Sequence, residues 1–318
     1  SNLNVNAGGR VDFAQTGAGL LSVNGHGYDV INHLQQLQAM GESANLDRRY
    51  ALGGNIDASA TALQHGGFKP IGSLASGSFT GVFDGLGHTI SHLHIDRPQE
   101  QAVGLFGSAQ GATLRNVGMV AGSMTGEKYT GSLVGYQTGG NISNAYSTAN
   151  VTGNDGTGGL VGYLESGRIS NAYTTGNVKG SWQTGGLVGN VMAGATGAQP
   201  SDSRNVYTMG SVEGRGNTGG LVGYLHQSSI SNAYTTASVT GQSQTGGLLG
   251  YSNAGSISNS YWNTETTGQA TSAGGGTGLT TAQMFDASRW TGFEFGTVWG
   301  NANGQTTPYL LNMASNQV

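Results

Sequence analysis

The stretch Gly158-Gly-Leu-Val-Gly-Tyr163, followed by Ile169-Ser-Asn-Ala-Tyr-Thr174, decides the fold, because close variants of both runs recur along the chain. The leucine of the first run recurs after 28, 27, 27, 34 and 27 residues. The leucines are Leu105, Leu133, Leu160, Leu187, Leu221 and Leu248. One step is longer because an insert, Ala193 to Pro200, lies inside that unit. A fixed period in this range is typical of a solenoid or an array of repeats.

The residue types within one unit favour β-strands. Gly, Thr, Asn, Ser and Val dominate, whereas helical repeats need Ala, Leu, Glu and Lys at a spacing of about 3.6 residues. Three strands of about five residues, each closed by a turn with glycine, would fill one unit. The sequence therefore predicts an all-β, right-handed parallel β-helix with one coil per repeat. A β-propeller is the competing interpretation, but a blade needs about 40 residues and four strands.

The composition excludes several classes of function. Of 318 residues, 59 are Gly and none is Cys, and 9% are charged, with a net charge of −4. Because there is no basic excess, we expect no nucleic-acid partner. Because there is no Cys, disulfides, thiolate metal sites and cysteine nucleophiles are excluded. No apolar run suggests a membrane span and no targeting signal stands at the start, so we expect a soluble, monomeric segment of a longer protein.

The sequence predicts four regions: an N-terminal flank (1–55), irregular first rungs (56–103), the repeats (104–262) and a C-terminal capping segment (263–318). Apolar residues at helical spacing in the flank predict one short helix against the stack, with Asn32 as N-cap. They are Ile31, Leu34, Leu37 and Met40, with Gly41 as the stop. Aromatic residues gather in 279–312, which we expect to cover the open end of the solenoid, beginning with a capping box of Thr280 and Gln283.

The repeated unit, Gly158-Gly-Leu-Val-Gly-Tyr163 with Ile169 to Val178, resembles the GLUG repeat of large bacterial surface proteins. The flanking sequences resemble those around such repeats in filamentous-haemagglutinin-like exoproteins; these are residues 50–57, 79–95, 277–284 and 307–310. The resemblance implies a right-handed parallel β-helix, two-partner secretion through an outer-membrane transporter, and adhesion or biofilm formation at the bacterial cell surface. It identifies no ligand.

Motifs that could carry chemistry are few. Among His88, His92 and His94, only the last two would share a face of a strand, and no carboxylate follows at ligand spacing, so turn-capping histidines are the alternative to a metal site. Gly214 to Gly219 matches a dinucleotide fingerprint but falls in the turn of a repeat and opens no helix. We therefore expect no metal and no cofactor.

Parallel β-helices include polysaccharide lyases and hydrolases, and these enzymes need several carboxylates that converge on one site. Only Glu127 and Asp155 occupy similar repeat positions, with Lys128 beside them. Isolated solubilising charges explain this arrangement equally well. The sequence therefore predicts a protein that is not an enzyme.

Several residue types recur at one position of the unit and should stack into columns. The Asn column, expected as a structural hydrogen-bonded ladder, comprises Asn116, Asn144, Asn171, Asn205, Asn232 and Asn259. The Thr column, expected to stabilise turns, comprises Thr130, Thr157, Thr184, Thr218 and Thr245. A Tyr column comprises Tyr146, Tyr173, Tyr207, Tyr234 and Tyr261.

The direction of that Tyr column depends on whether the chain bends at the preceding Asn. Straight alternation places Ile169, Asn171 and Tyr173 on the inner side, whereas a bend at Asn171 turns Ala172 inward and Tyr173 outward. Small residues alone would leave the interior short of volume. The sequence therefore favours inward tyrosines.

The turn before each threonine of the Thr column is the most variable part of the unit. These turns stack on one edge and predict a surface for a carbohydrate or protein partner, with solvated drifting turns as the alternative. The candidate binding residues are Lys128, Tyr129, Asp155, Trp182, Arg215 and Gln244. We expect a non-catalytic segment of a secreted bacterial adhesin-like exoprotein, acting as a rod and as a binding surface for a host or bacterial surface glycan or protein. The alternatives are a passive spacer and a polysaccharide lyase or hydrolase.

Overall fold

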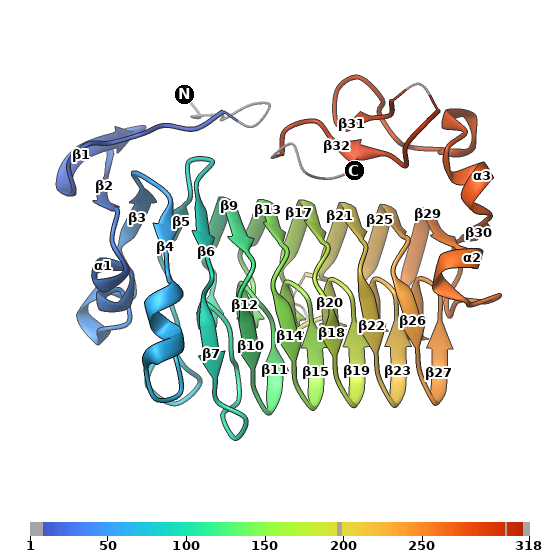
Figure 1. Ribbon diagram of the computed structural model, residues 1–318, viewed down its shortest axis with the longest axis horizontal. Coiled ribbons are helices and arrows are strands. Elements are labelled where there is room, and N and C mark those ends of the chain that lie inside the picture. Colours follow the sequence, from blue (N-terminus) through green and yellow to red (C-terminus); the bar gives the residue numbers. More distant parts are fainter. Residues whose placement is uncertain (1–8, 196–198, 303, 314–318) are drawn as a thin grey trace.

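A computed structural model describes residues 9–195, 199–302 and 304–313, and Figure 1 shows them forming one continuous stack of parallel coils. Each regular coil contributes one short strand to each of four parallel sheets, which we name faces A to D. Face A consists of β8 (Phe106–Gln110), β12 (Val134–Thr138), β16 (Val161–Glu165), β20 (Val188–Met192), β24 (Val222–His226) and β28 (Leu249–Asn253). In the repeats, face B consists of β9 (Thr113–Val120), β13 (Asn141–Ser147), β17 (Arg168–Thr174), β21 (Asp202–Thr208), β25 (Ser229–Thr235) and β29 (Ser256–Asn263).

The other two faces have shorter strands. Face C consists of β7 (His94–Asp96), β10 (Ser123–Thr125), β14 (Asn150–Thr152), β18 (Val178–Lys179), β22 (Ser211–Glu213) and β26 (Ser238–Thr240). Face D consists of β11 (Lys128–Thr130), β15 (Asp155–Gly158), β19 (Trp182–Gly185), β23 (Gly216–Gly219) and β27 (Ser243–Gly246). Equivalent residues of successive repeats pair directly, as Val151 does with Val178 and Thr157 with Thr184.

The predicted parallel β-helix with one coil per repeat is confirmed, but the expectation of three strands per coil is wrong. Each coil has four strands because the chain turns at Gly153 and Asn154, which places Val151 on face C and Thr157 on face D. The insert lies between β20 and β21, outside the strands as predicted, and its residues 196–198 fall outside the described part of the chain.

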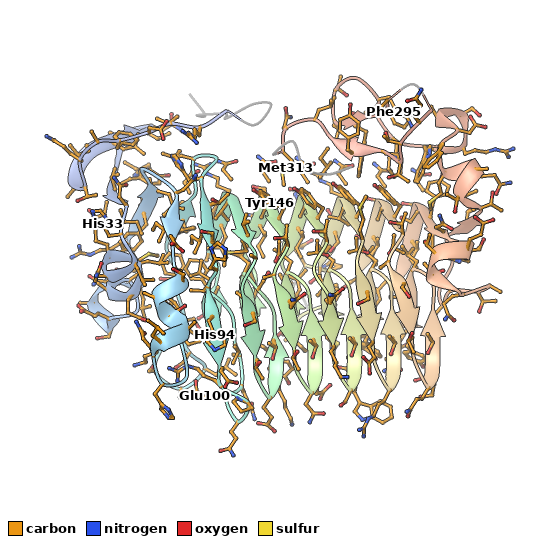
Figure 2. All side chains as sticks on the ribbon, viewed as in Figure 1. His33, His94, Glu100, Tyr146, Phe295 and Met313 are labelled. Carbon is orange, nitrogen blue, oxygen red and sulfur yellow. The ribbon has the colours of Figure 1, made fainter. Side chains whose placement is uncertain are left out.

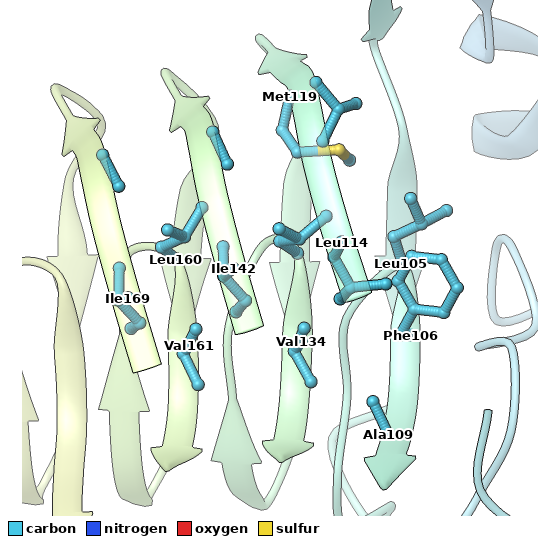
Figure 3. Packing of buried hydrophobic residues seen from close by; sticks show 14 of the residues in the cluster. Leu105, Phe106, Ala109, Leu114, Met119, Val134, Ile142, Leu160, Val161 and Ile169 are labelled. Atoms are coloured by element: carbon cyan, nitrogen blue, oxygen red, sulfur yellow. The ribbon is translucent and has the colours of Figure 1, made fainter. Parts of the chain in front are cut away.

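Columns of aliphatic side chains fill the interior of the stack. Leu160, just before face A, and Val161 of face A lie in one cluster with Ile142 and Ile169 of face B, and all four are fully buried (Figure 3). The repeated apolar positions of the sequence are thus inner positions of the coil. Because each inner coil packs directly on the coils before and after it, apolar area is buried between successive rungs as well as across the interior.

The chain bends at each member of the Asn column, where the backbone takes the left-handed conformation with φ between 44° and 55°. Asn tolerates this conformation better than other residues with a Cβ. The side-chain amides form the predicted ladder: Asn171 Nδ2 donates to Asn144 Oδ1 at 3.1 Å, and Asn144 Nδ2 donates to Asn116 Oδ1 at 3.0 Å. The ladder continues through Asn205, Asn232 and Asn259.

The bend turns the Tyr column outward, so the prediction of inward tyrosines is wrong. Ala172 lies in the interior, while Tyr173 belongs to a separate cluster on the outer side of face B. The columns of Leu and Ile side chains fill the interior instead, so inward tyrosine rings are not needed for core volume. Tyr173 is nonetheless 1% exposed, because the C-terminal segment covers the column from outside.

The N-terminal end of the stack is closed by a helix, as predicted. β1 (Gly17–Val23) and β2 (His26–Ile31) form an antiparallel pair, followed by α1 (Leu34–Ala39) and the 3-10 turn η1 (Ser43–Asn45). Leu37 and Met40 are buried in the core. The N-cap is His33 rather than Asn32, because Gln36 Oε1 accepts from the backbone N–H groups of both residues and starts the helix one residue later.

Irregular rungs connect this end to the repeats. They comprise β3 (Arg49–Leu52), β4 (Ile56–Asp57), η2 (Ser59–Leu63), β5 (Val82–Asp84) and β6 (Thr89–Ser91). These strands extend face B toward the N-terminus, and β5 and β6 both pair with β9.

The C-terminal segment covers both the end of the stack and one of its sides. Trp262 packs into the last coil, and α2 (Thr264–Thr267) and β30 (Thr277–Leu279) follow it at that end. The remaining elements are α3 (Thr281–Met284), η3 (Ala287–Arg289), β31 (Trp299–Gly300) and β32 (Tyr309–Leu310). They lie along the side of the stack beside face B, drawn in red in Figure 1. The aromatic cap therefore covers the Tyr column rather than the open end, and we call residues 280–313, with 303 undescribed, the strap.

The predicted capping box at the start of the strap is present, with Thr280 N donating to Gln283 Oε1 at 2.9 Å.

Candidate binding surface on face D

The predicted turn residues lie side by side on the outer part of face D. In the strand register, Lys128 pairs with Asp155, Asp155 with Trp182, and Trp182 with Gly216. Three of the six candidate residues therefore form one column over three successive rungs. Rungs of a parallel sheet lie about 4.8 Å apart, so Lys128 and Trp182 are separated by about 9.6 Å along the axis.

The next column along the strand contains Tyr129, and the structure gives it an unexpected backbone. Tyr129 has φ 55°, and the residues at the same position of later rungs are also left-handed. These are Gly156, Gln183, Asn217 and Gln244. Arg215 precedes the first column by one residue. The six predicted residues thus occupy three adjacent columns, which together we call the turn strip.

The two aromatic residues of the turn strip each lie on a glycine of the next rung. A Cβ added to Gly216 would stand 2.2 Å from Cζ3 of Trp182, and a Cβ added to Gly156 would stand 2.9 Å from Cδ1 of Tyr129. Each ring therefore rests directly on backbone. Trp182 is 52% exposed, so about half of its surface remains open to solvent.

Sequence reasoning missed the tyrosines of face A that adjoin the turn strip. The rings of Tyr136 and Tyr163 stack with centroids 4.8 Å apart, and the Tyr129 ring meets that of Tyr163 at 4.9 Å. The recurrence of Tyr after the Leu-Val-Gly run was the available signal. Burial, followed by the carboxylate of Glu165 2.8 Å from its hydroxyl, raises the pKa of Tyr136 to about 12. This aromatic group remains uncharged at neutral pH.

The face A tyrosines are interrupted by one polar residue. Asn190 stands in register between Tyr163 and Tyr224, and it is 4% exposed. Its Nδ2 donates to Oε1 of Gln183 at 2.7 Å, which joins face A to the turn strip. Beyond this break, Tyr224 stacks on Tyr251 with centroids 5.5 Å apart.

The charges of the turn strip and its margin balance. Lys128 and Arg215 are matched by Asp155 and Glu127. Partial burial raises the pKa of the Asp155 carboxyl, and the nearby positive charge of Lys128 opposes that shift. Oδ1 of Asp155 is buried and has no hydrogen-bond partner within the described residues. The strip therefore offers hydrogen-bonding groups without a strong field of either sign.

The carboxylates do not assemble into a catalytic pair. Asp155 is in register with Lys128, so Glu127 lies one column away, beside Asn154, whose N–H donates to the Glu127 carbonyl at 2.8 Å. Glu127 and Asp155 thus occupy similar repeat positions, as the sequence indicated, but they stand in adjacent columns and not in one. Glu165 is on face A, hydrogen-bonded to Tyr136, and Glu213 is on face C, 3.0 Å from Lys179.

The three histidines are separated and bonded elsewhere. His88 is buried, with Nε2 2.9 Å from the Val11 carbonyl, and His94 Nδ1 lies 2.8 Å from Ser123 Oγ. His92 Nδ1 lies 3.5 Å from Asp57. In the described part of the chain no three His, Cys, Asp or Glu side chains stand close enough to hold a metal ion. Across residues 9–195, 199–302 and 304–313, every helix is too short or too polar to cross a membrane.

Comparison with known protein families identifies the repeats. The GLUG motif matches residues 126–152, 153–179 and 214–240. Each match begins at the glycine before face D and ends on face C, so one motif corresponds to one coil. The coil between the second and third matches contains the insert. The chain therefore contains GLUG repeats, as the resemblance in the sequence indicated.

Two further likenesses were found. Over 127 residues, 38% of this chain, the sequence is 37% identical to Halomucin from Haloquadratum walsbyi (strain DSM 16790 / HBSQ001), of which the match spans 1%. A crystal structure from Bacteroides ovatus, provisionally described as an immunoglobulin A1 protease, superimposes with a TM-score of 0.63 and 20% identity. The superposition covers 89% of this chain and 92% of that one, and at this identity it shows a shared fold.

Proposed function

We propose that this chain is a non-catalytic rod segment of a secreted bacterial adhesin-like exoprotein, and that the turn strip is its carbohydrate-binding surface. The observation that carries the proposal is Trp182, a 52% exposed indole seated on Gly216 of a rigid stack. An exposed tryptophan of this kind adds no core packing, whereas a flat exposed ring in a polar surround is a common contact for ligands. The surrounding amides and carboxylates supply hydrogen bonds.

The GLUG repeats and the likeness to Halomucin support an extracellular or cell-surface repeat protein. The more specific assignment, a filamentous-haemagglutinin-like protein exported through an outer-membrane transporter and active in adhesion or biofilm formation, rests on the resemblance of the flanking sequences. Expression of the full-length protein with and without its transporter, followed by detection on the cell surface, tests that route.

A non-catalytic role is supported by the arrangement of the carboxylates. Glycoside cleavage needs two carboxyl groups facing each other across the scissile bond. On the turn strip, Asp155 faces Lys128 and Trp182 instead.

A glycan array with the intact chain tests the proposal. We expect retained binding to at least one glycan, loss of that binding in Trp182→Ala, and no loss in Leu74→Ala, whose side chain has a similar exposure of 49%. A chain that binds no glycan is a passive spacer or binds protein through this face. Release of unsaturated or reducing sugar ends, abolished by Asp155→Asn, would replace the proposal with an enzyme.

A further inference from the structure

This inference rests on the proposed function. The spacing of the two aromatic residues on the turn strip indicates which class of glycan the strip would bind. Tyr129 lies on the rung of Lys128, and Trp182 lies two rungs later. Stacked tyrosines of successive rungs have centroids 4.8 to 5.0 Å apart. Tyr129 and Trp182 are therefore offset along the axis by about 9.6 Å.

This spacing is fixed by the fold. Each ring rests on the backbone of a glycine in the next rung, Gly156 for Tyr129 and Gly216 for Trp182. The strands that carry them are joined by the parallel ladder of face D. Tyr129 is half-buried and Trp182 is exposed, so a ligand meets one partly covered ring and one open ring, both held in place, which lowers the entropy lost on binding.

We infer that the turn strip binds an extended, uncharged β-linked glycan that runs along the axis of the stack. In an extended β-1,4-linked chain, the length of one sugar residue is close to the distance between two successive rungs of a parallel sheet. Alternate sugars of such a chain would then lie over Tyr129 and Trp182. A coiled α-linked glycan does not keep this spacing.

The group between the two aromatic surfaces fits the intervening sugar. Asp155 stands on the middle rung, in register with Lys128 on one side and Trp182 on the other. A carboxylate accepts hydrogen bonds from sugar hydroxyls, and an ammonium donates to sugar oxygens. An acidic glycan would place its carboxylates near Asp155 and Glu127 as well as near Lys128 and Arg215, so this balanced strip offers it no net attraction to offset the cost of removing its charges from water, and an uncharged chain is favoured.

An exposed tyrosine outside the turn strip offers a matched control. Tyr251 on face A is 37% exposed and stacks on Tyr224 of the preceding rung. Its column has polar Asn190 two rungs away from Tyr251 instead of a second aromatic surface. Tyr251→Ala should therefore leave glycan binding unchanged.

Isothermal titration with β-1,4-linked gluco- and xylo-oligosaccharides of increasing length tests the inference. Affinity should rise when the oligosaccharide becomes long enough to reach both rings and then level off. Trp182→Ala and Tyr129→Ala should each lower the affinity of the long oligosaccharide by about tenfold or more, and Trp182→Phe should restore part of it. Affinity should be insensitive to salt.

The outcomes separate this inference from the proposed function. Binding of alginate, polygalacturonate or an α-linked glucan that depends on Trp182 would overturn the inference and leave the binding function intact. The absence of binding to every carbohydrate would overturn both. Loss of binding in Tyr251→Ala but not in Trp182→Ala would place the site elsewhere on the molecule. Thermal unfolding of each variant shows whether Tyr129→Ala acts through stability, and the exposed Trp182 carries the test if it does.

Discussion

The side-chain amide of Asn116 donates a hydrogen bond of 2.8 Å to the carboxylate of Asp84, and this contact ends the Asn ladder. Every rung of the ladder has the same polarity, with Nδ2 of each Asn donating to Oδ1 of the Asn one coil earlier. The aligned amide dipoles therefore present their positive end to a negative charge, which strengthens each bond in the chain. Asp84 is 1% exposed and also accepts from Arg115 Nε at 2.7 Å.

We predict that Asp84→Ala destabilises the stack strongly. It removes the acceptor of Asn116 and Arg115 and leaves a partly buried guanidinium without its partner, at a cost of about 3 to 5 kcal/mol. Asn259→Ala, at the exposed opposite end of the ladder, should cost only about 1 to 2 kcal/mol, mainly because Ala tolerates the left-handed backbone at φ 44° less well than Asn. Denaturant unfolding of the two variants measures the difference, and equal costs would show that the terminal carboxylate has no special role.

The bend at Asn explains which part of the fold could be predicted. The period, the parallel pairing and the inner Leu columns follow from the spacing of apolar residues alone, because a solenoid repeats one local solution. The direction of the Tyr column depends on the φ angle of Asn171, and Asn is compatible with both extended and left-handed backbone. The covering strap could not be foreseen, since nothing local in the Ile-Ser-Asn-Ala-Tyr run specifies a contact with residues as far along the chain as Trp290 and Trp299.

A second prediction concerns the glycine four residues before each threonine of the Thr column. A Cβ on Gly153 would stand 2.4 Å from Thr157 Oγ1 and 3.0 Å from Thr130 Oγ1. The same close approach recurs at Gly180, Gly214 and Gly241. Gly153→Ala should therefore destabilise by about 1 to 3 kcal/mol through overpacking.

Adding Thr157→Ala removes the nearer clash, so the double variant should be more stable than the sum of the two single changes by about 0.5 kcal/mol or more. Thr157 Oγ1 is buried without a hydrogen-bond partner in the described chain, so no conventional bond is lost with it. Strict additivity in urea unfolding would mean that the clash is relieved by backbone movement.

The third prediction is a pH dependence at Asp155. Burial raises the pKa of its carboxyl in the folded state, so the folded chain holds that proton more tightly than the unfolded chain. The contribution of this carboxyl group to the free energy of unfolding is fully present below its ordinary pKa of about 4. That contribution is lost as pH rises through the raised pKa of the folded state. Asp155→Asn should therefore gain stability relative to the natural chain between acidic and neutral pH.

Asp286 provides a control of opposite sign. Its hydrogen bonds from Ser288 lower the pKa of its carboxyl, so its stabilisation is present above the ordinary pKa and is lost as pH falls through the lowered value. Asp286→Asn should lose stability relative to the natural chain over the same rise in pH. Melting temperatures of the three proteins across the acidic range compare the slopes, and parallel slopes would contradict both assignments.

The turn strip was only partly predictable, for a physical reason. Its variability between repeats identified Lys128, Asp155 and Trp182, and the period alone placed them in one column. The seating of Trp182 on Gly216 depends on a glycine of the next repeat, and the contact of Tyr129 with Tyr163 crosses from one face to another. Such contacts require the angle between faces, which the sequence pattern does not encode.

The last prediction concerns the strap, whose Trp290 packs edge-on against Tyr234 and Tyr261 with centroids 5.2 and 4.9 Å away. Trp290 is 4% exposed, and its Nε1 donates to the Met284 carbonyl at 3.1 Å. Figure 2 shows the far end of the same segment, where Met313 lies beside Tyr146, the least covered tyrosine of the column. The strap thus contacts the stack through rings that point away from the core.

Trp290→Ala should therefore release the strap without unfolding the coils. Truncation of a large buried aromatic side chain costs about 3 to 5 kcal/mol, but here the loss falls on the docking of residues 280–313 rather than on the interior columns. Native-state hydrogen exchange should show lost protection in the strap and retained protection in β17, β21 and β25. Leu160→Ala, inside the stack, should instead lower protection in the neighbouring coils, because a solenoid transmits the loss to adjacent rungs. Equal loss of protection in the strap and the coils of Trp290→Ala would mean that the strap and the Tyr column belong to the cooperative core after all.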